Sequence, residues 1–64
     1  MNGEDKIFLL RAVMTIRAGA QQTTKFLLDK DNAHRLLTIR QELGREGFDA
    51  ELIKMKEIIE CHRN

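Results

Sequence analysis

Few side chains in this sequence have the type and spacing that catalysis requires. The chain contains no serine, one cysteine and two histidines, and Cys61 is followed directly by His62. Adjacent residues on a helix point about 100° apart, so these two do not form a nucleophile and its base. His34 stands alone and is predicted to be a polar helix residue. A pH-sensitive contact with a carboxylate such as Asp31 is its functional alternative.

Metal and cofactor sites are equally scarce in the sequence. A metal site needs about four His, Cys or carboxylate ligands in a set geometry, which His34, Cys61 and His62 do not supply. The four glycines lack the spacing, and the following Lys-Ser/Thr, of a phosphate-binding loop. We therefore expect no enzyme, no catalytic residue, no cofactor and no metal. A catalytic role would need a partner chain to complete the site.

Length and composition restrict the remaining classes of protein. We expect a single helical domain over residues 1–64, and a domain this short buries only about 60% of the surface that its unfolded chain exposes. One cysteine cannot form a disulfide within the chain. No apolar run approaches the ~20 residues of a membrane span, and Glu4 and Asp5 are not typical of a signal peptide. We expect a cytoplasmic protein, without membrane contact, that is stabilised by another chain.

The distribution of helix-breaking residues predicts where helices begin and end. The chain has no proline, so only glycines and Asp/Asn clusters interrupt its good helix formers. Asn2 is the expected cap of a first helix that is apolar on nearly every side. Residues 4–28 are compatible with one helix or with two. In the first case the small residues around Gly19 let a neighbour approach closely, and in the second they end the helix.

The second half of the chain predicts a pair of helices. One runs from about residue 32 to residue 43, after the turn-forming Asp29, and Gly44 stands where a left-handed C-cap belongs. The next is expected to start with Asp49 as N-cap, and Phe48 is expected to pack on Ile53 as a hydrophobic staple. Because the turn at residues 44–47 is short, these helices should fold back on each other. The predicted fold is all-α, a small two- or three-helix bundle with a C-terminal antiparallel helical hairpin.

The first helix has more apolar surface than one neighbour can cover, so two of its faces are expected to be buried. One face should pack on apolar residues of the later helices, namely Leu36, Ile39, Leu43, Leu52, Met55 and Ile59. The other should meet a second chain, and its candidate partner-binding residues are Ile7, Leu10, Arg11, Met14 and Arg17. The sequence therefore predicts a small protein-interaction module, such as an adaptor, inhibitor or regulatory subunit, that forms a homo-oligomer.

The uneven distribution of charge along the chain indicates an alternative function. Residues 6–40 carry seven basic against two acidic residues, a balance of +5, whereas residues 41–64 carry four against six, a balance of −2. A dimeric nucleic-acid-binding regulator would use basic residues of the first two helices: Arg11, Arg17, Lys25, Arg35 and Arg40. A helix-turn-helix around Gly44 would open its recognition helix with Asp49 and Glu51, whose carboxylates would face phosphate. Protein recognition is therefore the preferred prediction.

Overall fold

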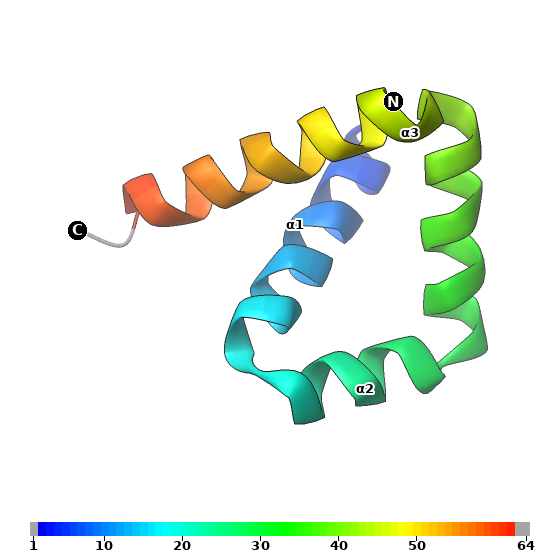
Figure 1. Cartoon of the computed structure of the whole chain (residues 1–64), viewed down its shortest axis with the longest axis vertical. Helices are drawn as coiled ribbons and strands as arrows, with labels where there is room; N and C mark the ends of the chain where they lie inside the picture. The colour runs from blue at the N-terminus through cyan, green and yellow to red at the C-terminus, as the bar shows by residue number, and fades with distance from the viewer. Residues whose placement is uncertain (1, 63–64) are drawn as a thin grey trace.

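Asn2 caps the first helix of the structure, a computed structural model that describes residues 2–62. Its side-chain oxygen accepts a 2.8 Å hydrogen bond from the amide of Asp5, as the sequence predicts. The helices are α1 (Gly3–Ala18), α2 (Ala20–Leu28) and α3 (Lys30–His62), and residues 2–62 form no strand (Figure 1). The predicted all-α fold, a small helical bundle, is confirmed and has three helices.

Gly19 separates α1 from α2, so residues 4–28 form two helices rather than one. Its backbone has φ 131° and ψ 173°, a region that essentially only glycine occupies. The Gly19 amide donates to the carbonyl of Ile16 at 3.3 Å, which leaves the carbonyl of Thr15 without its usual helical donor. The hydroxyl of Thr23 lies 3.5 Å from that carbonyl and 2.9 Å from the carbonyl of Gly19. A hydroxyl donates one proton, so Thr23 bonds the nearer carbonyl, that of Gly19 at the start of α2, while its oxygen lies beside the end of α1.

Gly44 divides α3 into two arms, residues 30–43 (the first arm) and residues 45–62 (the second arm). Its φ of 74° and ψ of 166° are non-helical, whereas the residues on both sides are helical. The predicted helix end at Gly44 and its positive φ are confirmed, but its ψ differs from that of a left-handed C-cap. The prediction that Asp49 caps the following helix is wrong, because the chain turns at one residue and the second arm is already helical at Arg45.

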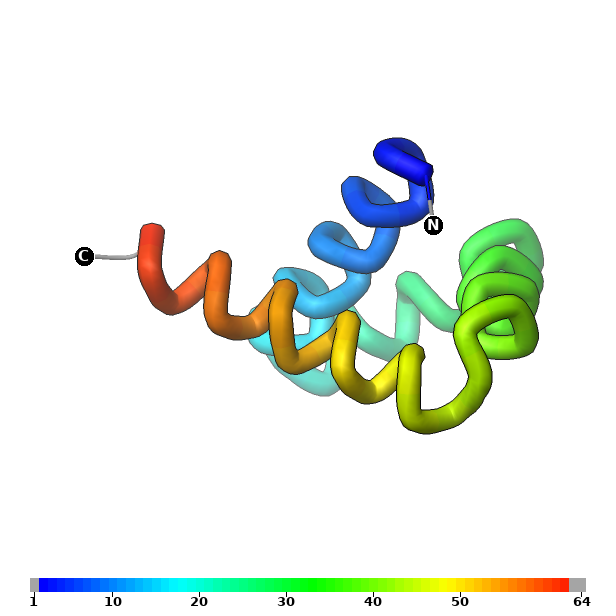
Figure 2. Tube along the Cα trace, turned by 90° about the horizontal axis from the view of Figure 1, so that it is seen from above, coloured from blue at the N-terminus to red at the C-terminus, as the bar shows by residue number. Residues whose placement is uncertain are grey.

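The two arms do not run side by side. Figures 1 and 2 show them leaving the corner at Gly44 in different directions, the second arm crossing over α1. The antiparallel orientation of the predicted hairpin is therefore not confirmed. Because the arms diverge, they approach α1 from different directions.

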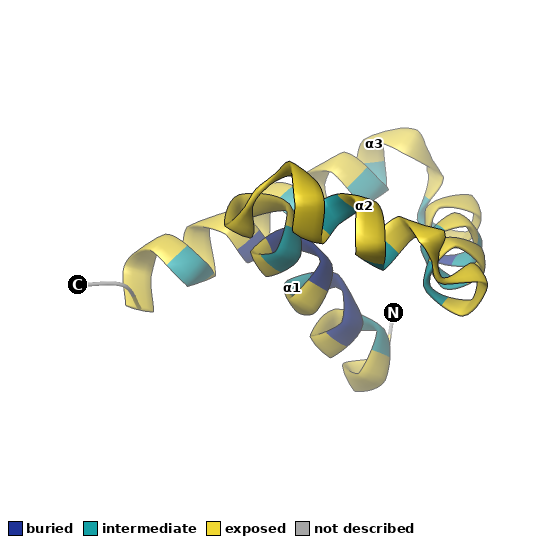
Figure 3. Ribbon diagram, turned by 90° about the horizontal axis from the view of Figure 1, so that it is seen from below, coloured by how far each residue is buried: buried dark blue, intermediate teal, exposed yellow. Residues whose placement is uncertain are grey.

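The core lies where both arms meet one face of α1. Leu9 is fully buried there against Ile39 of the first arm and Met55 of the second arm, and Phe8 and Val13 complete the cluster. Figure 3 shows buried segments along α1 and none on α2. The expected partners of this face all belong to the core or pack against it: Leu36, Ile39, Leu43, Leu52, Met55 and Ile59. The predicted inner face of the first helix is thus confirmed.

Helix α2 closes the bundle through its C-terminal end. The ring of Phe26 packs on that of Phe8, with 5.6 Å between the centroids. The side-chain amide of Asn32 donates to the carbonyl of Phe26 at 3.2 Å, which ties the end of α2 to the start of α3. Asp29 caps α3 by accepting a 2.9 Å hydrogen bond from the amide of Asp31. Each helix consequently contacts both of the others.

We expect Gly44→Ala to lower the free energy of unfolding by about 1–3 kcal/mol, because alanine has to adopt a backbone conformation that only glycine occupies without strain. Gly3→Ala is the matched control. Gly3 lies in the first turn of α1, and a Cβ built there has no neighbour within 4 Å, so stability should be unchanged or slightly higher. Thermal unfolding followed by circular dichroism compares the three proteins. Equal midpoints for Gly44→Ala and the wild type would contradict this role of Gly44.

Candidate partner-binding surface

The predicted partner-binding residues share one side of α1, the side turned away from Leu9. At 100° per residue, positions 7, 10, 11, 14 and 17 fall within one third of the helix circumference. Ile7 and Met14, two turns apart, are 63% and 54% exposed. We call this set the outer face of α1. Its members are Ile7, Leu10, Arg11, Met14 and Arg17.

The other members of the outer face differ in their surroundings. Leu10 is half-buried and packs against the edge of the core, so it is less available to a partner than the sequence suggests. Arg11 is exposed and lines a shallow hollow with Ile7 and Arg35. Arg17 forms an ion pair with Glu60 of the second arm, with 3.1 Å between Nη1 and Oε1. The outer face thus presents two exposed apolar side chains beside two arginines.

Two basic residues of the nucleic-acid alternative, Arg11 and Arg35, line the same hollow. Arg35 lies over the ring of Phe8, with 4.7 Å from its guanidinium carbon to the ring centroid, and its Nη2 is 3.4 Å from a carboxylate oxygen of Asp5. It therefore joins the first arm of α3 to α1. Lys25 and Arg40 are exposed on different helices. Sequence reasoning missed the role of Arg35 because Asp5 lies thirty residues away in the chain.

A groove between α1 and the second arm was not predicted. It has a volume of about 470 Å³ and is bounded by Val13, Ile16, Leu52 and Ile53. Ile16 and Ile53 are each more than half exposed. Its charged residues are Arg17 and Lys56. Because the residues of this groove lie almost forty positions apart, their periodicity within each helix gives no sign of it.

An apolar pocket of about 160 Å³ lies between all three helices and shares Ile16 and Leu52 with this groove. Its walls include Ile16, Phe26 and Leu52. Thr15 and Thr23 also line it, but their hydroxyls donate to the carbonyls of Arg11 and Gly19 at 2.8 Å and 2.9 Å. These hydroxyls are thus bonded to backbone, and the pocket can accept only an apolar group.

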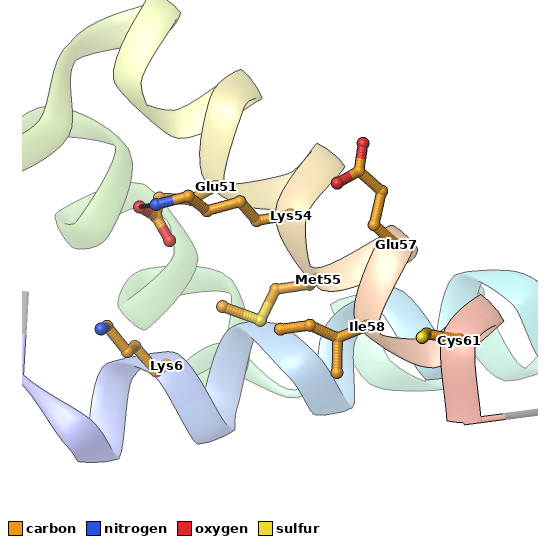
Figure 4. Close-up of a pocket in the computed structure, with 7 residues that line it drawn as sticks. All are labelled: Lys6, Glu51, Lys54, Met55, Glu57, Ile58 and Cys61. Atoms are coloured by element: carbon orange, nitrogen blue, oxygen red, sulfur yellow. Dashed lines mark ion pairs between the residues drawn. The ribbon is translucent and has the colours of Figure 1, made fainter.

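The opposite side of the second arm borders an open hollow of about 490 Å³. Figure 4 shows Met55 and Ile58 extending toward α1 beside Lys6, with the thiol of Cys61 at the far end. Here Lys54 Nζ lies 3.5 Å from a carboxylate oxygen of Glu51, one turn earlier on the same arm. The positive charge of Lys54 is therefore already balanced within the chain.

Comparison with known proteins gives no relative of this chain. No protein-family model matches the chain, and no curated protein or solved structure matches it either. Within residues 2–62, no three His, Cys, Asp or Glu side chains are grouped as metal ligands. Over the same residues, no helix is long and apolar enough to cross a membrane.

We expect Arg35→Gln to lower the free energy of unfolding by about 1 kcal/mol, because it removes a partly exposed cation–π contact and an ion pair. Arg40→Gln is the control, since Arg40 is exposed on the same arm and forms no ion pair with the described residues. Urea unfolding measures both. Equal losses in the two variants would show that Arg35 does not stabilise the bundle.

Proposed function

We propose that this chain is a small protein-interaction module, an adaptor, inhibitor or regulatory subunit, that acts as an oligomer and binds a partner protein through the outer face of α1. The observation that carries the proposal is the amount of apolar surface left uncovered. Within residues 2–62, six apolar residues are buried, one of them the small Ala12, and eight large ones are exposed. The exposed ones are Ile7, Met14, Ile16, Leu27, Leu28, Leu37, Ile53 and Ile58.

The small core makes the uncovered apolar surface important for stability. Full burial of one large apolar side chain contributes about 1.5–3 kcal/mol, whereas a core in a domain of this length rarely supplies more than about 3–5 kcal/mol. Covering Ile7 and Met14 would therefore add stability comparable to that of the isolated chain. Such a gain favours the bound state over the free one.

The arginines of the outer face supply specificity. Arg11 is exposed beside Ile7, and Arg17 is held in position by its ion pair with Glu60. Arginine next to an apolar centre is typical of protein interfaces, where its planar guanidinium forms paired hydrogen bonds with carboxylates. The partner surface is expected to carry apolar side chains for Ile7 and Met14 and at least one carboxylate for Arg11.

The nucleic-acid alternative has weaker support. Arg17 and Arg35 each lie next to a carboxylate of the same chain, Glu60 and Asp5. A phosphate contact at either arginine would have to displace that carboxylate or tolerate it nearby. The other three, Arg11, Lys25 and Arg40, are exposed on three different helices, so they do not form a stripe along one helix.

We expect a photoreactive residue at position 14, introduced in the host cell, to form a covalent adduct with a partner protein. Ile7→Glu in the same chain should reduce that adduct about tenfold or more, because a charge replaces an apolar side chain at the contact. Circular dichroism checks that this variant is folded. The yield of the adduct is measured by mass spectrometry.

Two controls accompany this experiment. Lys54→Glu changes the charge on the other side of the second arm and should leave the adduct yield unchanged. The photoreactive residue at position 21, where Gln21 is exposed on α2, should give no adduct of the same mass. Adducts with nucleic acid at position 14, or a protein adduct that Ile7→Glu does not reduce, would contradict the proposal.

A further inference from the structure

One exposed stripe of the second arm alternates charges around an apolar residue. Its members are spaced by four, four, three and four residues, as on the contact stripe of a coiled coil. All of them are exposed, and Ile53 is 58% exposed at the centre. We call these residues the charged stripe. In chain order they are Arg45, Asp49, Ile53, Lys56 and Glu60.

The order of charges makes the stripe complementary to itself when it is reversed. The midpoint between Arg45 and Glu60 along the helix lies between residues 52 and 53, beside Ile53. The midpoint between Asp49 and Lys56 is the same point. At 1.5 Å per residue, the first two lie about 11 Å from this point and the second two about 5 Å. A two-fold axis there would place each positive charge opposite a negative charge of another copy.

We propose that a second copy of this chain packs antiparallel along the charged stripe, with the two-fold axis beside Ile53. Arg45 then faces Glu60 of the second copy, and Asp49 faces Lys56 of the second copy. Symmetry repeats each pair, so four ion pairs surround the contact between the two isoleucines. The inference rests on the proposed function in taking the chain to be an oligomer, but it does not use Ile7 or Met14, the exposed apolar residues of the outer face of α1.

Stabilisation within a single helix does not explain this charge pattern. Arg45 and Asp49 are four residues apart, as are Lys56 and Glu60, but in both pairs the basic residue comes first, the less favourable order for such pairs. Neither pair forms an ion pair in the structure, and among the described residues Arg45, Asp49 and Lys56 have no ion-pair partner at all. These three charges are therefore available to another chain.

The helix dipole favours the same arrangement. Arg45 lies in the first turn of the second arm, where a positive charge is unfavourable, and Glu60 lies in the last turn, where a negative charge is unfavourable. Antiparallel packing places the two ends side by side, so each charge meets its opposite. Glu60 can accept from Arg17 of its own chain and from Arg45 of the second copy, because a carboxylate has two oxygens.

The groove beside the stripe provides the apolar part of the interface. Ile53 borders the groove of about 470 Å³ that it shares with Val13, Ile16 and Leu52. In the antiparallel pair, Ile53 of each copy lies over the groove of the other and covers Ile16. A stable interface buries roughly 800 Å² on each partner, about one sixth of the 5000 Å² that this chain exposes. The proposed interface extends along the second arm, which at 1.5 Å per residue is about 27 Å long, and over the groove.

The test is a charge exchange measured by sedimentation equilibrium of the purified full chain. The wild type should be a dimer. Lys56→Glu and Asp49→Lys should each weaken the dimer about tenfold, because each turns two exposed attractions into repulsions. The double variant should restore the wild-type dissociation constant. Lys54→Glu, which makes the same change in net charge as Lys56→Glu on the other side of the arm, should have no effect.

Mixing the two single variants gives a second readout. Lys56→Glu makes both inner charges of the stripe, at positions 49 and 56, acidic, and Asp49→Lys makes both of them basic. The mixture should therefore form a heterodimer more readily than either variant forms a homodimer. High salt should weaken the wild-type dimer, whereas an apolar contact through α1 would resist it. Circular dichroism of each variant is the control for folding.

Three outcomes would overturn the inference: a wild-type chain that is monomeric up to about 1 mM, single variants that dimerise like the wild type, or a double variant that is not restored. Met14→Glu separates this inference from the proposed function. It should leave the dimer intact while reducing partner adducts formed at position 7. If Met14→Glu abolishes the dimer and the charge variants do not, the second copy binds at α1 and the inference fails.

Discussion

Both arms of α3 must reach the same face of α1, and the rest of the structure depends on that requirement. A straight helix of the 33 residues of α3 would be about 50 Å long, whereas the longest extent of the molecule is 33 Å. Such a helix could bring Ile39 or Met55 to Leu9, but not both. The turn at Gly44 brings both side chains to Leu9, and its backbone conformation is essentially restricted to glycine. One residue thus determines whether the chain has a core.

The two glycines that divide the helices lower the stability of the folded chain. Gly19 and Gly44 both lose more conformational entropy on folding than any other residue type would. Helix α2 contributes no fully buried residue and is attached through Phe26 and the side chain of Asn32. A bundle with so few buried side chains is at the low end of stability for a domain. The proposed binding of another chain would therefore also stabilise the bundle.

The features predicted from the sequence are those set by local chemistry. Gly44 and the Asn2 cap were predicted correctly because they depend on backbone preferences of single residues, and the inner face of α1 followed from helical periodicity. The prediction for Asp49 failed because a good N-cap residue does not cap a helix that has already begun at Arg45. The divergence of the two arms was also missed, because a turn residue does not fix the angle between helices.

The candidate surfaces were predicted less completely, because they depend on contacts between segments that are far apart in the sequence. Exposure of Ile7 and Met14 could be expected from their position opposite Leu9. The half-buried state of Leu10 and the engagement of Arg35 with Phe8 and Asp5 depend on contacts between distant segments. No pattern within one helix reports such contacts. The charge order of the second arm is visible in the sequence, but its exposure becomes known only once the arm is placed on α1.

The ion pair between Arg17 and Glu60 connects the two proposed surfaces. Arg17 belongs to the outer face of α1, and Glu60 belongs to the charged stripe. A second copy that brings Arg45 to Glu60 holds the carboxylate in place, and this carboxylate in turn holds Arg17 in one orientation, which lowers the ordering cost of binding a partner there. A partner whose own carboxylate draws Arg17 away would instead release Glu60. Since coupling between two binding sites is reciprocal, partner binding and self-association then affect each other to the same extent.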